Sequence, residues 1–435
     1  MRILVLNSEI PFPPITGAQS RTYHLLKRLS AEHDVTLVGF RWDSQDLPVS
    51  CSLPVEVICV PWAPSEYYRN MHEGSPSESQ AAYRYLAYES AEPWFVSYYN
   101  SAAMENSLGD LMSRWFDLIL IEHSFMARFL PFLRPDVPKV LDMHNVHTLM
   151  AWRRAQEKFG GDKHDLVKEF ERTQSFERTV CSACQLCFCC SEQDAEAAHH
   201  FLSIKHLRVI ANGVDTAMMT PAKAGVKPGH LLFTGMMNYG PNVEAVRYFV
   251  AEILPLIQAE VPCATFHIAG ANPSPEVKAL AAESVYIHGF VPDMRPYFHQ
   301  ASVVVVPLLH GGGTRLKILD AAACGKPIVS TSMGAEGLNF VGGRDLLLAD
   351  SAPTFAQTVV RLLTNPERQT ELSRCARRAA EAYDWSKIAS EFCSVITGVA
   401  QGRRKGSYSF QSLVTNTTAH RVNSGDPWEK VRITS

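Results

Sequence analysis

The sequence predicts an α/β protein of two domains, each built on a doubly wound parallel sheet, facing each other across a cleft. Short apolar segments alternate with helical segments along both halves of the chain. These apolar segments are near-continuous runs, which is typical of parallel strands covered on both faces. An aperiodic stretch at 209–229, carrying Gly, Pro and Lys, separates the two series and is the predicted linker.

Composition and charge narrow the class of protein. The chain has 435 residues, of which 46% are hydrophobic and 20% charged, as in ordinary globular proteins. A net charge of −3 argues against a broad nucleic-acid-binding surface. No apolar run reaches the ~18 residues of a membrane span, and the run at the amino terminus is too short for a signal peptide. We therefore expect a cytoplasmic protein with no nucleic-acid partner.

The first domain is predicted at 1–208. It begins with the strand "RILVLN", which is followed by an amphipathic helix at 18–33. A helix is also predicted from Ser191. The remaining predicted strands of this domain are 34–40, 55–60, 116–122, 139–144 and 185–190.

Five of the eleven cysteines lie between Cys181 and Cys190. A metal cluster would need a second group of Cys or His at a set spacing. His199 and His200 follow, but on the predicted helix. The preferred interpretation is a buried strand in which cysteine acts as a small hydrophobe.

The second domain is predicted at 230–385, again as alternating strands and helices. A terminal helix at 386–402 follows, on a route that could cross back to the first domain. The last segment, 403–435, is polar and aperiodic and is predicted to be a flexible tail. Its basic residues could make a weak contact with a membrane surface, although a solvated tail is the simpler interpretation. The predicted strands of the second domain are 231–236, 264–270, 285–290, 302–309 and 326–331.

The clearest functional signal is the stretch "HGGGTRLKILDAAACGKPIVS" at 310–330. Three glycines follow an apolar strand and precede a helix, an arrangement in which backbone N–H groups face an anion. Thr314 is the predicted N-cap. Arg315 and Lys317 fall in the first turn, where cations oppose the helix dipole unless an anion is bound. The alternative is that both side chains point into solvent. The predicted diphosphate-binding residues are Gly311, Gly312, Gly313, Thr314, Arg315 and Lys317.

Further residues are predicted at the same edge of the sheet. Asp320 lies six residues after Thr314 in the same stretch, and it could accept hydrogen bonds from a ribose or pair with Lys317. Two more strand–glycine junctions occur at 233–246 and 330–340, the first with Asn242 as a possible helix cap. Convergence of three junctions favours a nucleotide-diphosphate site. The residues contributed by these two junctions are Gly235, Gly334 and Glu336.

These motifs resemble the family-4 glycosyltransferases, which are retaining enzymes with two Rossmann-like domains, the GT-B fold. The resemblance covers most of residues 1–400 and is closest to bacterial members associated with exopolysaccharide and cell-envelope sugars. The segments that carry it are "PPITGAQSRTYHLLKRLS", "FDLILIEHSFMA", "VLDMHNV", "VIANGVD", "FTGMMNYGPNVEAVRYF", "GFVPDMRPYFHQASVVVVPL" and "GGGTRLKILDAAACGKPIVSTSMGAEGL".

The resemblance implies a nucleotide-diphosphate sugar as donor substrate, a glycan or lipid-linked acceptor, and no cofactor or metal. It implies that the loop at Gly17 approaches the donor phosphates. It also implies that His144, flanked by Asp142 and Asn145, faces the transferred sugar. His123 is a second candidate, at the end of a neighbouring predicted strand.

The chain departs from the family pattern at two places. Of the two glutamates that the family spaces eight positions apart, the first is Gly312 here and the second is Asp320. Many relatives place a phosphate-binding arginine directly after the "TG" of the first carboxyl-domain strand, where this chain has Met236 and Met237. Arg315 and Lys317 are therefore the main candidates for the diphosphate.

Two other functions fit the same motifs. A nucleotide-sugar epimerase would convert the donor without an acceptor. A non-catalytic binding protein would keep the cleft but not the turnover. The ten aromatic residues within 62–99 also permit two interpretations, an irregular lobe filled by large side chains or an acceptor surface on which rings stack against sugars.

Overall fold

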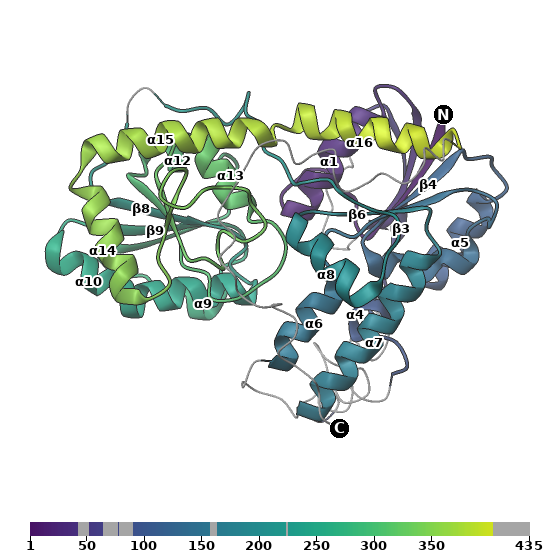
Figure 1. The fold of residues 1–435 in the computed structure, drawn as a ribbon, viewed down its shortest axis with the longest axis horizontal. Coiled ribbons are helices and arrows are strands. Elements are labelled where there is room, and N and C mark those ends of the chain that lie inside the picture. Colours follow the sequence, from purple (N-terminus) through teal and green to yellow (C-terminus); the bar gives the residue numbers. More distant parts are fainter. Residues whose placement is uncertain (42–51, 64–76, 78–89, 157–162, 223–224, 403–435) are drawn as a thin grey trace.

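The computed structural model describes residues 1–41, 52–63, 77, 90–156, 163–222 and 225–402. These residues form two α/β domains side by side (Figure 1). The predicted fold class is confirmed, because each domain is built on one parallel sheet. The predicted tail at 403–435 and most of the aromatic-rich segment lie outside the described residues. Among the helices that are described, none is both long and apolar enough to cross a bilayer.

The first domain contains a seven-stranded sheet in the order β3-β2-β1-β4-β5-β6-β7. The strand order reverses beside β1, because β2 pairs with one of its edges and β4 with the other. Ligands bind beyond the carboxyl ends of strands at such a reversal. The short strand β7 has no apolar pattern and was not predicted. The strands are β1 (Arg2–Asn7), β2 (Asp34–Arg41), β3 (Val55–Pro61), β4 (Leu118–Glu122), β5 (Lys139–Asp142), β6 (Leu186–Cys189) and β7 (Leu207–Val209).

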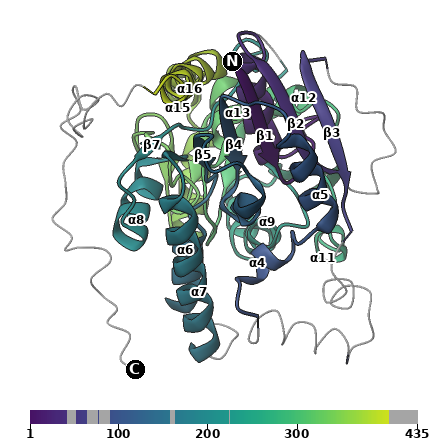
Figure 2. The ribbon, with the colours of Figure 1, turned by 90° about the vertical axis from the view of Figure 1, so that its right-hand side faces the viewer.

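Helices cover both faces of this sheet. Alternate residues of β1 enter different cores: Ile3 belongs to the core that contains Leu25 of α1, whereas Leu4 belongs to the core that contains Leu108 of α5. Figure 2 shows α6 and α7 extending away from the sheet. The helical elements are α1 (Gly17–Leu29), α4 (Trp94–Ser97), α5 (Ala102–Leu111), the 3-10 segment η2 (Ser124–Phe132), α6 (His147–Gln156), α7 (Lys163–Ser182) and α8 (Glu192–Leu202).

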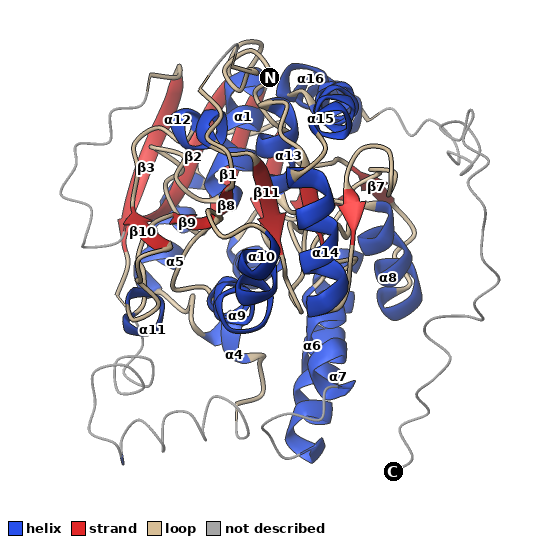
Figure 3. Cartoon of the chain, turned by 90° about the vertical axis from the view of Figure 1, so that its left-hand side faces the viewer, coloured by secondary structure: helices blue, strands red, loops and turns tan. Residues whose placement is uncertain are grey.

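The second domain contains a six-stranded parallel sheet in the order β10-β9-β8-β11-β12-β13. Its strand order reverses at β8, between β9 and β11. Figures 1 and 3 show α12 and α13 on one side of the sheet and α9 and α10 on the other. The strands are β8 (His230–Thr234), β9 (Thr265–Ala269), β10 (Val285–Gly289), β11 (Val303–Val306), β12 (Ile328–Ser330) and β13 (Leu347–Leu348).

Most helices of this domain begin with a local signal. Ser351 and Thr354 form a capping box at α14, and Asn365 caps α15. The helical elements are α9 (Gly240–Tyr248), the π-helical η3 (Phe249–Ile253), α10 (Leu254–Glu260), α11 (Pro275–Lys278), α12 (Arg295–Gln300), α13 (Leu316–Ala323), α14 (Ala352–Leu363), α15 (Pro366–Ala380), the 3-10 turn η4 (Glu381–Tyr383) and α16 (Trp385–Ala400).

The last helix, α16, connects the two domains. It follows α15 directly and packs against α1 of the first domain (Figure 1). Phe392 of α16 contacts Phe188 of β6, with ring centroids 5.2 Å apart. At the start of the helix, Trp385 stacks on His24 of α1 at 5.0 Å. One apolar core therefore runs from the second domain into the first.

The cysteine-rich segment forms the end of α7 and the strand β6. Cys187, Cys189 and Cys190 are at most 1% exposed. Burial raises the pKa of the Cys190 thiol to about 12, so this thiol stays protonated at neutral pH. Within the described part of the chain, these cysteines do not form a group with metal-binding geometry. The observed structure matches the buried-strand interpretation.

Candidate active site

A cavity of about 1060 Å³ lies between the two domains. Its first-domain wall is formed by loops and helix starts that follow β1, β4 and β5. Its second-domain wall is formed by the segments that follow β8, β9, β10 and β11. The cavity thus lies at the carboxyl ends of the strands and includes those beside each reversal of strand order, the position at which parallel sheets bind ligands.

The start of α1 meets the start of α13 across this cavity. Thr16 caps α1, and its hydroxyl accepts from the Gln19 backbone in a capping box. Gly17 packs directly against Leu316, because a Cβ at this glycine would lie 2.9 Å from Leu316 Cδ1. A glycine at this position lets the two helix starts approach closely. Gly17 therefore lines the cavity, and its approach to the donor phosphates stays a prediction.

The glycine loop 311–313 also lines the cavity. Gly311 and Gly313 have φ of 131° and 70°, values that other residues rarely adopt. A Cβ at Gly313 would lie 2.5 Å from Asn145 Oδ1 of the first domain. The loop thus needs glycine both for its backbone conformation and for its contact with the opposite wall.

The predicted role of Thr314 as helix cap is wrong. Helix α13 begins at Leu316 with Arg315 at its N-cap position, and no side chain caps it. The Thr314 hydroxyl instead donates to the carbonyl of Cys190 in the first domain, at 3.5 Å. The interdomain contact outweighs the local capping preference. The N–H groups in the first turn of α13 consequently have no side-chain cap.

Arg315 is a buried cation with unsatisfied donors. The residue is 8% exposed, and its Nη1 donates to the carbonyls of Gly312 and Gly313. Its Nε and Nη2 are buried without a partner among the described residues. Burial lowers the pKa of this guanidinium. Buried donors of this kind beside a cavity are suited to binding an anion.

Lys317 is held at the back of the same wall. Its Nζ donates to Asn242 Oδ1 at 2.8 Å and lies 3.9 Å from the centre of the Phe233 ring. Burial, and then the charge of Arg315, lowers the pKa of Lys317 well below its usual range. The alternative that Arg315 and Lys317 point into solvent is therefore wrong.

Gly235 makes room for this lysine. It has a φ of 151°, and a Cβ there would lie 2.7 Å from Asn242 Nδ2 and 3.1 Å from Lys317 Nζ. The prediction that Asn242 caps a helix is wrong, because α9 begins at Gly240. Asn242 instead bonds Lys317 and donates from Nδ2 to the carbonyl of Met236 at 2.9 Å.

Asp320 lies one turn further along α13 and lines the cavity. Burial raises the pKa of its carboxyl to about 7. The predicted alternative of an ion pair with Lys317 is not observed in the described structure, where Lys317 bonds Asn242. Asp320 thus faces the cavity and has no ion pair with any residue that the structure describes.

The structure does not bring Gly334 and Glu336 into the described cavity lining, which corrects their predicted placement. The Gly334 N–H donates to Thr331 Oγ1 at 2.9 Å. The Glu336 carboxylate binds Arg153 of α6, with N–O distances of 2.7 and 2.8 Å. Arg153 also donates to the carbonyl of Gly311 at 3.0 Å. Glu336 therefore joins the two domains at the rim of the glycine loop.

The first-domain wall carries two histidines in left-handed backbone conformations. His123 and His144 have φ of 71° and 50°, and such strain, about 1–3 kcal/mol per residue, is concentrated at functional sites. His144 Nε2 lies 2.5 Å from Glu122 Oε2, and the two imidazole rings are 3.9 Å apart. Both histidines line the cavity together with Asn145. Burial lowers the pKa of His123 well below its usual range.

Asp142 supports this wall from behind and does not itself line the described cavity. Its two carboxylate oxygens accept from Nε and Nη2 of Arg21 at 2.8 and 3.0 Å. Arg21 also donates to the carbonyls of Ile210 and Ala211 at 2.9 and 3.1 Å. The positive charge of Arg21 holds the pKa of Asp142 below its usual range although burial opposes this.

Arg21 was missed in the sequence, although a signal for it was present. The residue lies four positions before Leu25 on the apolar face of α1, where an unpaired arginine would be strongly destabilising.

Glu122, Asp142 and His144 lie close enough to suggest a metal site. Both oxygens of Asp142, however, already hold the Arg21 guanidinium, and Glu122 holds His144. The group therefore fits a buried hydrogen-bonded ion network, in which Arg21 supplies the positive charge.

Two known protein families match the chain. The family "Glycosyltransferase Family 4" matches residues 15–218, and "Glycosyl transferases group 1" matches residues 228–365. A D-inositol 3-phosphate glycosyltransferase of Arthrobacter sp. (strain FB24) is 28% identical over 225 residues, which are 45% of this chain and 52% of that protein. A phosphatidyl-myo-inositol mannosyltransferase of Propionibacterium freudenreichii is 26% identical over 48% of this chain and 55% of its own length. The chain thus spans about half the length of these curated relatives.

Solved structures share the two-domain fold. Sucrose-phosphate synthase of Thermosynechococcus elongatus superposes with a TM-score of 0.70 at 16% identity, covering 92% of this chain and 100% of that one. HepE of Anabaena, solved in complex with UDP, superposes with a TM-score of 0.63 at 14% identity, covering 92% and 100%. At these identities the likeness shows the fold alone.

Removing the charge of Asp142 should destabilise the protein strongly. In Asp142→Asn, Arg21 stays buried opposite a neutral amide, and we expect the free energy of unfolding to fall by about 3–5 kcal/mol, measured by urea denaturation. Asp34→Asn is the control, because its pair with Arg2 is 3.7 Å long and exposed. That change should cost less than about 1 kcal/mol. Equal losses in both variants would contradict the role of the buried pair.

Asp320 should make stability depend on pH. Its pKa is about 7 in the folded protein and about 3.8 when exposed, so the folded state binds more protons between these values. Wild-type stability should therefore fall as pH rises through this window. Asp320→Asn should raise the melting temperature at pH 8 more than at pH 5, whereas Asp110→Asn, at an exposed position, should raise it at neither. A pH-independent effect would argue against a buried titrating carboxyl.

Proposed function

Because the chain belongs to the family-4 glycosyltransferases, we propose that it transfers a sugar from a nucleotide-diphosphate donor to a glycan or lipid-linked acceptor, with retention at the anomeric carbon. The observation that carries this proposal is Arg315, a buried guanidinium whose free donors lie beside the glycine loop at an interdomain cavity. Such a group requires an anion, and the diphosphate of the donor supplies one.

The diphosphate would be bound by the second domain. The N–H groups on Nε and Nη2 of Arg315 have no acceptor among the described residues, and Lys317 lies behind them. The backbone N–H groups at the start of α13 have no side-chain cap. As the glycosidic bond breaks, negative charge grows on the departing diphosphate. Preorganised donors at that point stabilise the transition state more than the bound donor, which is how such a site accelerates the reaction.

The nucleoside would extend along α13 toward Asp320. At neutral pH this carboxyl is partly ionised, since its pKa is about 7. Its ionised form can accept two hydrogen bonds from ribose hydroxyls. The shorter aspartate side chain, in place of the glutamate usual in the family, calls for a correspondingly closer approach of the ribose.

The transferred sugar would face His144 on the first-domain wall. Glu122 orients the imidazole ring through its bond to Nε2, and the strained backbone holds the ring at the cavity. The acceptor hydroxyl would attack the same face that the diphosphate leaves, and the departing phosphate would take its proton. The reaction therefore requires no protein nucleophile. Domain closure over the donor would exclude water and limit its hydrolysis.

We further propose that the reaction needs no metal, because Arg315, Lys317 and the uncapped start of α13 already supply positive charge. The resemblance to bacterial envelope enzymes supports a place in exopolysaccharide or cell-envelope synthesis, at the cytoplasmic side of the membrane. The mannosyltransferase relative, whose name specifies phosphatidyl-myo-inositol, supports a lipid-linked acceptor.

A direct test combines a ligand screen with a product assay. UDP, GDP, ADP and dTDP sugars are screened for protection against thermal unfolding, since a ligand of the native state raises its apparent stability. UDP is the first choice, because HepE was solved with it. The bound sugar is then incubated with and without lipid-linked glycan acceptors. Transfer supports the proposal, an isomerised donor without acceptor indicates an epimerase, and binding without turnover indicates a non-catalytic protein.

Arg315→Ala and Lys317→Ala should each weaken nucleoside-diphosphate binding. Loss of a charge-assisted hydrogen bond costs about 1.5–3 kcal/mol, which raises the dissociation constant about 10- to 100-fold in calorimetry. Arg247→Ala removes an exposed cation of the same domain and should leave the affinity unchanged. Unchanged affinity in both cavity variants would exclude these residues as the diphosphate site.

His144→Ala should lower turnover more than donor affinity, because the ring faces the sugar and not the diphosphate. Steady-state kinetics would show a reduced kcat, while calorimetry would give a dissociation constant close to that of the wild type. His206→Ala, at an exposed histidine of the same domain, is the matched control. Wild-type turnover in His144→Ala would remove this histidine from the site.

A further inference from the structure

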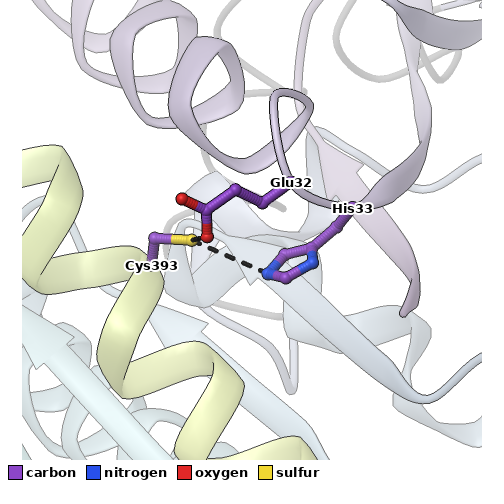
Figure 4. Close-up of side chains that lie close together, drawn as sticks. All are labelled: Glu32, His33 and Cys393. Carbon is purple, nitrogen blue, oxygen red and sulfur yellow. Dashed lines mark hydrogen bonds between the residues drawn. The ribbon is translucent and has the colours of Figure 1, made fainter.

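A second group of possible ligands lies where α16 crosses the end of α1 (Figure 4). Glu32 and His33 follow the last turn of α1, and Cys393 lies on the facing side of α16. Figure 4 shows the three side chains converging on one point between the two helices. None of the three lines the described interdomain cavity. The proposed transfer reaction does not use them.

The distances within this cluster match the edges of a tetrahedral metal site. Cys393 Sγ lies 3.5 Å from Glu32 Oε2 and 3.7 Å from His33 Nε2. Zinc binds sulfur at about 2.3 Å and nitrogen or oxygen at about 2.0–2.1 Å. Two such ligands at a tetrahedral angle are then separated by about 3.5 Å. All three ligand atoms lie within 4.8 Å of one another.

The surroundings orient these ligands. Arg28 pairs with the other oxygen of Glu32, Oε1, and so leaves Oε2 directed at the cluster. The Nε2 atom of His33 also lies 3.2 Å from the hydroxyl of Thr397, one turn along α16 from Cys393, and this contact holds the ring at the crossing. Cys393 is buried, whereas Glu32 is exposed. Because Glu32 is exposed, a water molecule can reach the cluster from the solvent side.

We propose that Glu32, His33 and Cys393 bind a zinc ion, with water as the fourth ligand. A thiolate, an imidazole and a carboxylate in tetrahedral positions are the ligand types that zinc takes in proteins. Binding forms the Zn–S bond as the Cys393 thiol releases its proton to solvent, while the His33 imidazole nitrogen and a Glu32 carboxylate oxygen supply lone pairs for the other two bonds. The bound ion links α16 to the end of α1.

A zinc ion at this site would restrain the position of the second domain relative to the first. Helix α16 follows directly from the second domain, and the other end of α1 lines the interdomain cavity. An ion at the crossing therefore holds the helix that links the domains to the helix that presents Gly17. The site is separate from the diphosphate, so it leaves the proposed metal-independent transfer unaffected.

The experiment is a cobalt titration of the full-length chain after treatment with a chelator. Tetrahedral Co²⁺ bound to a thiolate gives strong visible bands and a near-ultraviolet charge-transfer band. We expect these bands to saturate at one equivalent and to disappear when Zn²⁺ is added. Cys393→Ser should abolish the charge-transfer band, whereas Cys263→Ser, at an exposed thiol elsewhere, should retain it. A missing band, or one that persists in Cys393→Ser, overturns the proposal.

A second variant keeps the test decisive if Cys393→Ser does not fold. Glu32→Gln changes an exposed side chain and leaves the thiol and the imidazole in place. We expect it to weaken cobalt and zinc binding by at least about tenfold and to lose the rise in melting temperature that zinc causes in the wild type. Wild-type affinity in folded Glu32→Gln would show that the carboxylate is not a ligand, and the three-residue site would be wrong.

Discussion

The buried ion pair between Arg21 and Asp142 is the interaction on which the rest of this structure depends. Arg21 is 1% exposed and reaches from α1 to the end of β5 and to the carbonyls of the segment that leaves the first domain. Both charges are removed from water, so each must be fully hydrogen-bonded by the other and by the backbone. Satisfying them sets the position of α1 on the sheet. The start of that helix is thereby placed opposite the glycine loop.

The charges in the cavity are arranged unequally on its two walls. The second domain presents the cations Arg315 and Lys317, and burial depresses the pKa of both. The first domain presents His144 on a buried glutamate. Buried donors such as Arg315 Nε and Nη2, which have no partner among the described residues, cost free energy that a bound anion would offset. Departures from local rules of this kind are concentrated at functional sites, where stability is exchanged for a preorganised environment.

Contacts between the domains are concentrated around this cavity. Gly17 packs on Leu316, Gly313 lies against Asn145, and Arg153 joins Glu336 to the glycine loop. Helix α16, whose first residue Trp385 also lines the cavity, continues the second domain onto the first. The two sets of contacts differ in nature. The contacts at the cavity involve glycines or an ion pair, and such contacts can break and form again when the domains move. Helix α16, by contrast, is held by a continuous apolar core. Such a combination permits closure about a fixed connection.

The sequence by itself determined the elements and the chemistry that neighbouring residues encode. Apolar runs located the main strands, Ser191 capped α8, and the glycine motif with Arg315 and Lys317 marked one wall of the cavity. These signals act over a few residues. Only the tertiary structure decided how distant groups pair. It placed Arg21 on Asp142, 121 positions away, turned the Thr314 hydroxyl to Cys190, and directed Glu336 to Arg153. The physical reason is that a buried polar group must find its partner wherever the packed chain provides one, and no local pattern records which partner that will be.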